Sequence, residues 1–189
     1  MKKVFLASLM TICIAASASA LEIKPYVGFF PISYEFSTRE RDGSDDQDYT
    51  ILNLGMLPNI LVGVKVSDFR VDFTANWALV LDTPTPSLNV YYDFEVNENL
   101  LPYVKLGGGY LSQTKELDGG DKNTRTTTTY AVGAGIGYKV VNNFIFDLGV
   151  DYNIMKEKNE HKDKFSGSTS TSKTTYSGFG VRLGGRVQF

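Results

Sequence analysis

The sequence predicts an all-β protein, an eight-stranded antiparallel up-and-down β-barrel that crosses a membrane. Three observations carry this prediction. After residue 20 the chain divides into eight stretches of alternating apolar and polar residues, and the links between them are alternately short and long. Within the stretches, the charged residues fall on one face of each strand. Period-two alternation is typical of strands with two different surroundings, and the short–long rhythm is typical of membrane barrels.

The first twenty residues indicate an export signal. Lys2 and Lys3 form a positive start, residues 4–16 are apolar, and Ala18-Ser19-Ala20 is a small-residue cleavage site. The apolar part is shorter than the roughly 20 residues of a membrane-spanning helix. We therefore expect a signal peptide at 1–20 and a barrel domain at 21–189.

The predicted strands cover 23–37, 50–66, 69–80, 88–96, 101–114, 126–141, 144–156 and 174–189. The short links are Ser67-Asp68, 97–99 and Asn142-Asn143. The last predicts a two-residue hairpin, because asparagine tolerates positive φ. The longer links are 38–49, 81–87, 115–125 and 157–173, which are rich in polar residues, glycine and proline.

Each strand has one apolar face. The first strand keeps its alternation only with a slip of one residue near Phe29-Phe30, just before Pro31, so we expect a β-bulge there. The other apolar faces, in chain order, are Leu52, Leu54, Met56, Ile60, Val62 and Val64; Phe69, Val71, Phe73, Ala75, Trp77 and Leu79; Leu88, Val90, Tyr92, Phe94 and Val96; Val104, Leu106 and Tyr110; Tyr130, Val132, Ile136, Tyr138 and Val140; Phe144, Phe146, Leu148, Val150, Tyr152 and Ile154; and Phe179, Val181, Leu183, Val187 and Phe189.

The polar faces carry basic and acidic residues in nearly equal number. The basic ones are Lys24, Lys65, Arg70, Lys105, Lys139, Arg182 and Arg186, and the acidic ones are Glu35, Asp72, Asp93, Glu95, Asp147 and Asp151. An eight-stranded barrel is too narrow to hold the many apolar rings, and an arginine facing lipid at mid-depth costs about 2–4 kcal/mol. We therefore expect the apolar faces to meet lipid and the charges to form a lumen network, with Arg182 and Arg186 beside Asp147 and Asp151.

The aromatic residues are expected to mark the two membrane interfaces. Phe69, Phe94, Tyr138, Phe144 and Phe189 lie near the short links or the C-terminus. The band toward the long links comprises Tyr34, Trp77, Tyr110, Tyr130 and Tyr152.

Residues 176–189 resemble the closing strand of bacterial outer-membrane proteins. In those proteins the barrel-assembly machinery recognises alternating apolar residues that end in phenylalanine; the matching positions here are Phe179, Val181, Leu183, Val187 and Phe189. With the glycine-rich segments 102–110 and 133–138, the chain resembles the OmpA/OmpX-type and opacity-type eight-stranded barrels. The resemblance implies an outer-membrane location, with outer-membrane lipid, lipopolysaccharide and the assembly machinery as partners.

Few residues support other chemistry. The single cysteine, Cys13, lies in the export signal, and the acidic balance argues against a nucleic-acid partner. Residues 42–48 are rich in aspartate but do not fit an EF-hand loop, so we expect no metal or cofactor. The glycines at 133, 135 and 137 recur within a strand, whereas a dinucleotide-binding motif opens a helix.

His161, the only histidine, is expected in a loop without a rigid partner. Some small outer-membrane barrels are lipid A deacylases with a Ser–His pair, so a lipid-modifying enzyme is one competing hypothesis, although we expect no enzymatic activity. The favoured hypothesis is a surface-exposed, envelope-structural or adhesion-type protein that reaches a host or cell-surface ligand through four extracellular loops. The sequence also leaves open a narrow passive pore and a soluble periplasmic ligand carrier.

Overall fold

The computed structural model describes residues 22–41, 49–53, 59–76, 85–94, 96–116, 122–162 and 168–189, and of 32–41 and 49–53 only the backbone. The strands are β1 (Ile23–Arg41), β2 (Tyr49–Asn53), β3 (Asn59–Val66), β4 (Phe69–Asn76), β5 (Thr85–Asp93), β6 (Leu100–Glu116), β7 (Lys122–Val141), β8 (Phe144–Lys162) and β9 (Thr169–Gln188). Within these residues no helix is long and apolar enough to cross a membrane. The expected export signal, residues 1–20, lies outside the described residues.

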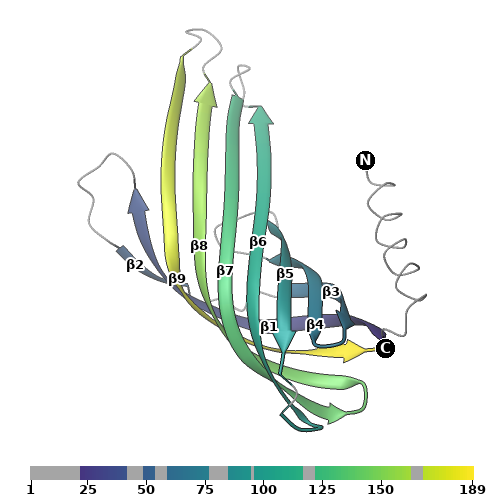
Figure 1. Ribbon diagram of the computed structural model, residues 1–189. Helices are drawn as coiled ribbons and strands as arrows, with labels where there is room; N and C mark the ends of the chain where they lie inside the picture. The colour runs from purple at the N-terminus through teal and green to yellow at the C-terminus, as the bar shows by residue number, and fades with distance from the viewer. Residues whose placement is uncertain are drawn as a thin grey trace.

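The strands form one antiparallel ring. β1 pairs with both β2 and β3, each strand from β3 to β8 pairs with the next along the chain, and β1 pairs with β9 to close the circle (Figure 1). β2 and β3 both pair with β1, so the two segments together occupy the place predicted for the strand 50–66. The ring therefore has eight strand positions, and the predicted eight-stranded barrel is confirmed.

The predicted bulge in β1 is also confirmed. The pairing of β1 with β9 shifts by one residue between Phe29 and Ile32. The shift spans Pro31, which has no backbone N–H to donate to a neighbouring strand. Before the shift, Tyr26 and Phe30 lie on the inner side, where both are buried, and Phe29 is exposed on the outer wall; after it, the backbone of Ile32 pairs with Leu183.

Two tight turns form where they are expected, but by different means. Ser67-Asp68 joins β3 to β4, and Ser67 has a φ of 53°, in the left-handed region. Asn142-Asn143 joins β7 to β8, yet neither asparagine has a positive φ, so that part of the prediction is wrong. Instead, the pairing of β7 with β8 shifts between Lys139 and Val141. A β-bulge increases the local twist of the strands, and here it takes the place of a type I′ or II′ turn, whose backbone twist would match that of the flanking strands.

β6 to β9 are longer than predicted and rise well above β3 to β5 (Figure 1). β8 and β9 stay paired up to Lys162 and Thr169, so most of the predicted loop 157–173 is strand, and His161 lies in β8. The apolar–polar contrast ends at the membrane surface, whereas backbone pairing continues through β-branched threonines. Of the other predicted loops, 42–48, 81–84 and 117–121 lie outside the described residues, as do Trp77 and Leu79.

The two faces of the ring have opposite chemistry. On the outer wall large apolar side chains are exposed, among them Phe73, Leu106 and Val150. On the inner side, at the same depth, the buried side chains include Lys65, Arg70, Asp72, Asp93, Lys105, Asp147, Asp151, Arg182 and Arg186. Where the ring is closed it leaves no unpaired strand edge, so that part of the wall suits hydrocarbon.

Candidate functional site

Arg70 on β4 is buried in the lumen. Its Nε donates to Oδ1 of Asp93 over 2.8 Å, and Lys65 Nζ lies 3.4 Å from Asp93 Oδ2. The guanidinium carbon is 4.3 Å from the ring centroid of Tyr91 and 4.9 Å from that of Tyr103. Stacking of a desolvated arginine on an aromatic face contributes about 2 kcal/mol. Arg70 is therefore held by charge at one carboxylate and by two tyrosine rings.

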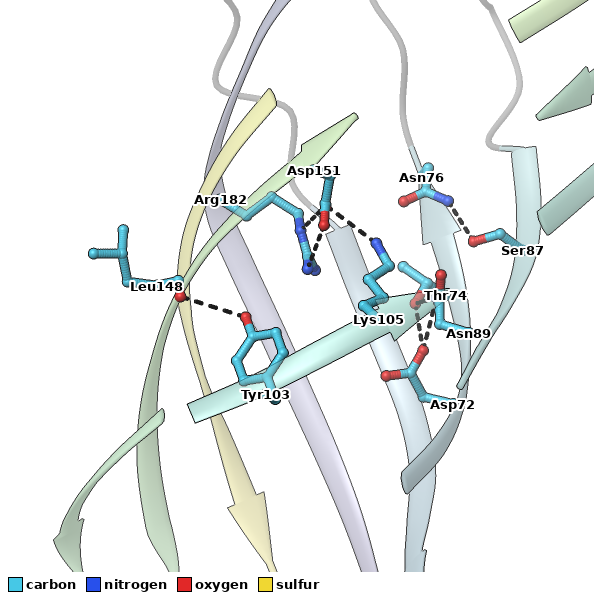
Figure 2. A network of polar contacts seen from close by, with 10 residues as sticks. All are labelled: Asp72, Thr74, Asn76, Ser87, Asn89, Tyr103, Lys105, Leu148, Asp151 and Arg182. Atoms are coloured by element: carbon cyan, nitrogen blue, oxygen red, sulfur yellow. Dashed lines mark hydrogen bonds and ion pairs between the residues drawn. The ribbon is translucent and has the colours of Figure 1, made fainter. Parts of the chain in front are cut away.

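Asp151 on β8 joins three strands. Its carboxylate accepts a hydrogen bond from Lys105 Nζ at 3.1 Å and one from Arg182 Nη2 at 3.3 Å, and Arg182 Nε forms an ion pair with the other oxygen (Figure 2). The lysine comes from β6 and the arginine from β9. This one acidic side chain on β8 thus links β6 to β9, which are not neighbours in the ring.

Arg186 and Asp147 form a second pair lower on the same two strands. Arg186 Nη1 donates to Asp147 Oδ1 over 3.0 Å, and both side chains are 2% exposed. At this depth, removing one partner leaves an uncompensated charge, which costs about 3–5 kcal/mol.

Asp72 on β4 is satisfied mainly by neutral donors. Its oxygens accept hydrogen bonds from Tyr26 Oη at 3.1 Å, Thr74 Oγ1 at 3.0 Å and Asn89 Nδ2 at 2.8 Å, and the last two are drawn in Figure 2. Because Tyr26 belongs to β1, this contact ties the first strand to β4 across β3.

Glycines on the inner faces of β6 and β7 make room for these groups. A Cβ at Gly133 would collide with Asp151 Oδ1, and one at Gly135 would collide with the Tyr103 ring. A Cβ at Gly107 would collide with Asn89 Oδ1. The inward glycines are therefore the space that the charged and aromatic side chains fill.

The remaining predicted lumen residues lie elsewhere. Lys139 is half-buried at the short-turn end and has no ion pair with the described residues; it lines a cavity of about 570 Å³ with Lys24 and Lys65. Lys24 is paired with Glu22 at 2.8 Å. Glu95 and the side chain of Glu35 lie outside the described residues, although the Glu35 backbone pairs with Gly180.

Sequence reasoning placed Tyr91 on the polar face but missed the other two lumen tyrosines, Tyr26 and Tyr103. Tyr26 and Tyr103 each lie two residues from a polar-face lysine, Lys24 and Lys105, and that spacing places them on the same face. It also missed the pair above the lumen, in which Arg125 Nη2 donates to Glu157 Oε2 over 2.6 Å. The sequence predicts a loop at Glu157, and a loop position gives no partner for Arg125.

The residues of the closing strand lie on the outer wall of β9. Phe179 and Phe189 are exposed, and Val181, Leu183 and Val187 are half-buried between neighbouring outer side chains. The aromatic residues predicted near the short turns, Phe69, Phe94, Tyr138, Phe144 and Phe189, are likewise exposed. In the other band Tyr110 and Tyr130 are exposed and Tyr152 packs 5.0 Å from Phe179, while the side chains of Tyr34 and Trp77 lie outside the described residues.

Among solved structures, several outer-membrane proteins are similar to this chain. OprG from Pseudomonas aeruginosa is 13% identical with a TM-score of 0.51, and the match covers 88% of this chain and 95% of that one. Neisserial surface protein A is 17% identical with a TM-score of 0.48, covering 90% and 100% of the two chains. AlkL, solved in lipid bilayers, is 17% identical with a TM-score of 0.49, covering 90% and 92%.

Identities at this level show the fold alone, and no curated protein sequence matches the chain. The family model described as "Outer membrane protein beta-barrel domain", however, matches residues 4–186. The chain therefore belongs to the outer-membrane β-barrel domain family, and it is a protein of the bacterial outer membrane.

Proposed function

We propose that the protein is a surface-exposed barrel with a closed lumen, which acts through its extracellular ends in adhesion or in the structure of the envelope. The observation that carries the proposal is the chain of buried ion pairs across the lumen. Arg70–Asp93 joins β4 to β5, and Lys105–Asp151, Arg182–Asp151 and Arg186–Asp147 join β6 and β9 to β8.

The closed lumen argues against transport. Eight strands enclose only enough space for side chains, and here that space holds the rings of Tyr26, Tyr91 and Tyr103 as well as the ion pairs. Ions that pass must displace paired charges that are shielded from water. The charge network therefore stabilises the barrel rather than lining a path.

The tall side of the barrel supports a surface role. In barrels of this kind the longer connections face the outside of the cell. β6 to β9 carry polar side chains past the aromatic band, and the Arg125–Glu157 pair holds β7 and β8 together there. This gives a stiff sheet on which a host or cell-surface ligand would bind.

Planar-bilayer recording tests the closed lumen. The chain purified from outer membranes is expected to give no single-channel steps, because the ion pairs bar the lumen. Steady steps would favour the narrow passive pore instead.

Attachment of whole bacteria tests the surface role. Deleting 113–125 removes the paired upper ends of β6 and β7 and joins Ser112 to Thr126 as a two-residue turn between the paired Leu111 and Thr127. Attachment to an epithelial monolayer should fall, while heat-modifiable migration on gels should show that the barrel still folds. Unchanged attachment would leave the envelope-structural role alone.

Assembly and surroundings complete the proposal. Phe179, Val181, Leu183, Val187 and Phe189 on β9 serve as the signal that the barrel-assembly machinery recognises. Lipid and lipopolysaccharide surround the outer wall. The proposal includes no catalysis: His161 stands at the exposed upper end of β8, in the row opposite Asn123 and Ser170.

A further inference from the structure

Three lysines stand on the outer wall just above the upper aromatic band. Lys156 and Lys158 on β8 and Lys173 on β9 are exposed, and they share the outward face with Tyr152. Lys156 is four residues above Tyr152, about 13 Å along the strand. This is the height at which lipid headgroups meet a barrel whose aromatic rings mark the interface.

The pairing of β8 with β9 places like charges together. Lys158 lies directly opposite Lys173, and Lys156 is in the next outward-facing row, opposite Thr175. Lys158 forms an ion pair with Glu160, but Lys156 and Lys173 have none with the described residues. Like charges in directly opposed positions destabilise a sheet, so an anion beside this wall would relieve a real cost.

An apolar groove lies next to these lysines on the same wall. It has a volume of about 430 Å³, and its lining includes Phe73, Leu88, Gly108, Tyr110 and Tyr130. It forms where the pairing of β5 with β6 ends, at Ser87 and Gly109, while β6 continues to Glu116. Gly108 leaves the groove unfilled because it has no side chain. A Cβ there would project into open space and meet only the Thr129 carbonyl oxygen, at 3.5 Å.

The groove and the lysines belong to one continuous surface. Tyr110 pairs with Thr128, and Thr128 pairs with Lys156, so these three residues form one row across β6, β7 and β8. The next row outward runs from Ser112 through Thr126 to Lys158 and Lys173. With strands about 4.8 Å apart, Lys156 lies about 10 Å from Tyr110. A hydrocarbon chain in the groove therefore ends beside the cationic group.

We propose that this surface binds one phosphorylated lipid of the outer leaflet, with an acyl chain in the groove and a phosphate at Lys156, Lys158 and Lys173. The occupant follows from the surroundings: the wall faces lipid, the groove is apolar, and the adjacent side chains are cations without enough carboxylates. A lysine near an anionic membrane surface strengthens binding about fivefold. The site depends on the membrane position of the barrel and not on any adhesive ligand.

The amount of lipid A that stays bound to the protein measures binding at this site. The full chain is placed in phosphatidylcholine nanodiscs that contain lipid A, with or without its phosphates, and is then released into detergent for native mass spectrometry. The chain should keep phosphorylated lipid A and lose the dephosphorylated form. Replacing the three lysines by glutamine should lower retention by about fivefold for each lysine. Gly108→Leu, which fills the groove and keeps every charge, should also lower it severalfold.

A matched control separates the site from general charge. Lys115, Lys122 and Lys162 lie at the long-loop ends of β6, β7 and β8, farther from the groove than the three site lysines. Their replacement by glutamine removes the same charge. That variant should retain lipid A like the unaltered chain. The proposal is overturned if the control loses lipid as strongly as the site variant, if Gly108→Leu retains it fully, or if inorganic phosphate alone displaces it. Attachment to epithelial cells is a separate assay, so failure here leaves the surface role intact.

Discussion

Arg182 on β9 and Asp151 on β8 meet inside the barrel, and Lys105 from β6 reaches the same carboxylate at 3.1 Å. Asp151 thus has two cationic partners, whereas Asp147 is paired with Arg186 alone among the described residues, at 3.0 Å. The two aspartates lie at different depths on β8. Removing one cationic partner from each therefore allows a direct comparison of the unfolding free energy that is lost.

Arg186→Ala should be more damaging than Arg182→Ala. Loss of Arg186 leaves Asp147 with a buried charge and should cost about 3–5 kcal/mol of unfolding free energy. Arg182→Ala should cost less, because Lys105 remains beside Asp151. Urea titration of the protein in lipid vesicles measures both. Lys122→Ala, which breaks the exposed pair with Glu116, is the control and should change stability by less than about 1 kcal/mol.

Removing two of the arginines that fill the lumen should open it to ions. Arg70→Ala combined with Arg186→Ala takes away the guanidinium groups that fill the space beside Tyr26, Tyr91 and Tyr103. Planar-bilayer recordings of the double variant should then show conductance that the unaltered chain lacks. Lys139→Ala at the short-turn end serves as the control and should stay silent. A folded double variant that stays silent as well would show that the remaining lumen side chains close it without these two arginines.

The glycines should tolerate substitution according to the face they occupy. Gly135→Ala puts a methyl group into the Tyr103 ring and should reduce the heat-modifiable folded fraction markedly. Gly108→Ala projects into open space and should be neutral, or stabilising by up to about 1 kcal/mol. Gel mobility before and after boiling distinguishes the two. Equal folding of both variants would contradict the inward placement of Gly135.

A charge on the outer wall should be costly at mid-depth only. Val150 is 48% exposed on the outer face of β8, so Val150→Arg should lower stability by about 2–4 kcal/mol. Thr114→Arg on the upper end of β6 lies past the aromatic band and should cost at most about 1 kcal/mol. Folding titrations into vesicles give both values. A small effect at Val150 would place that face away from hydrocarbon.

The ring and its orientation are predictable because burial repeats with period two along the strands. Phe144, Phe146 and Leu148 alternate with Ile145 and Asp147, and membrane and lumen impose that contrast. Even the bulge at Pro31 shows as a slip in the pattern. Arg182 and Asp151 are expected on adjacent strands from chain order alone, since the barrel is a sequence of hairpins.

Other features need the structure, for two physical reasons. The upper parts of β8 and β9 have water on both sides, so no contrast marks residues 157–162 as strand. Contacts across the lumen, such as Tyr26 with Asp72, depend on the stagger of all strands around the ring. Hydrophobic patterning carries no information on that stagger. The groove at Gly108 arises in the same way, from β5 ending earlier than β6.

The pairing of β1 with β9 makes barrel formation depend on the last of the described strands to be synthesised. Residues from Tyr26 to Arg41 pair through their backbones with residues from Thr174 to Gln188. Until the latter are synthesised, the nascent sheet has two unpaired strand edges. Such edges are incompatible with hydrocarbon and prone to self-association. Insertion must therefore be a late, concerted event, and a chain interrupted before β9 would wait in the periplasm as a substrate for chaperones and proteases.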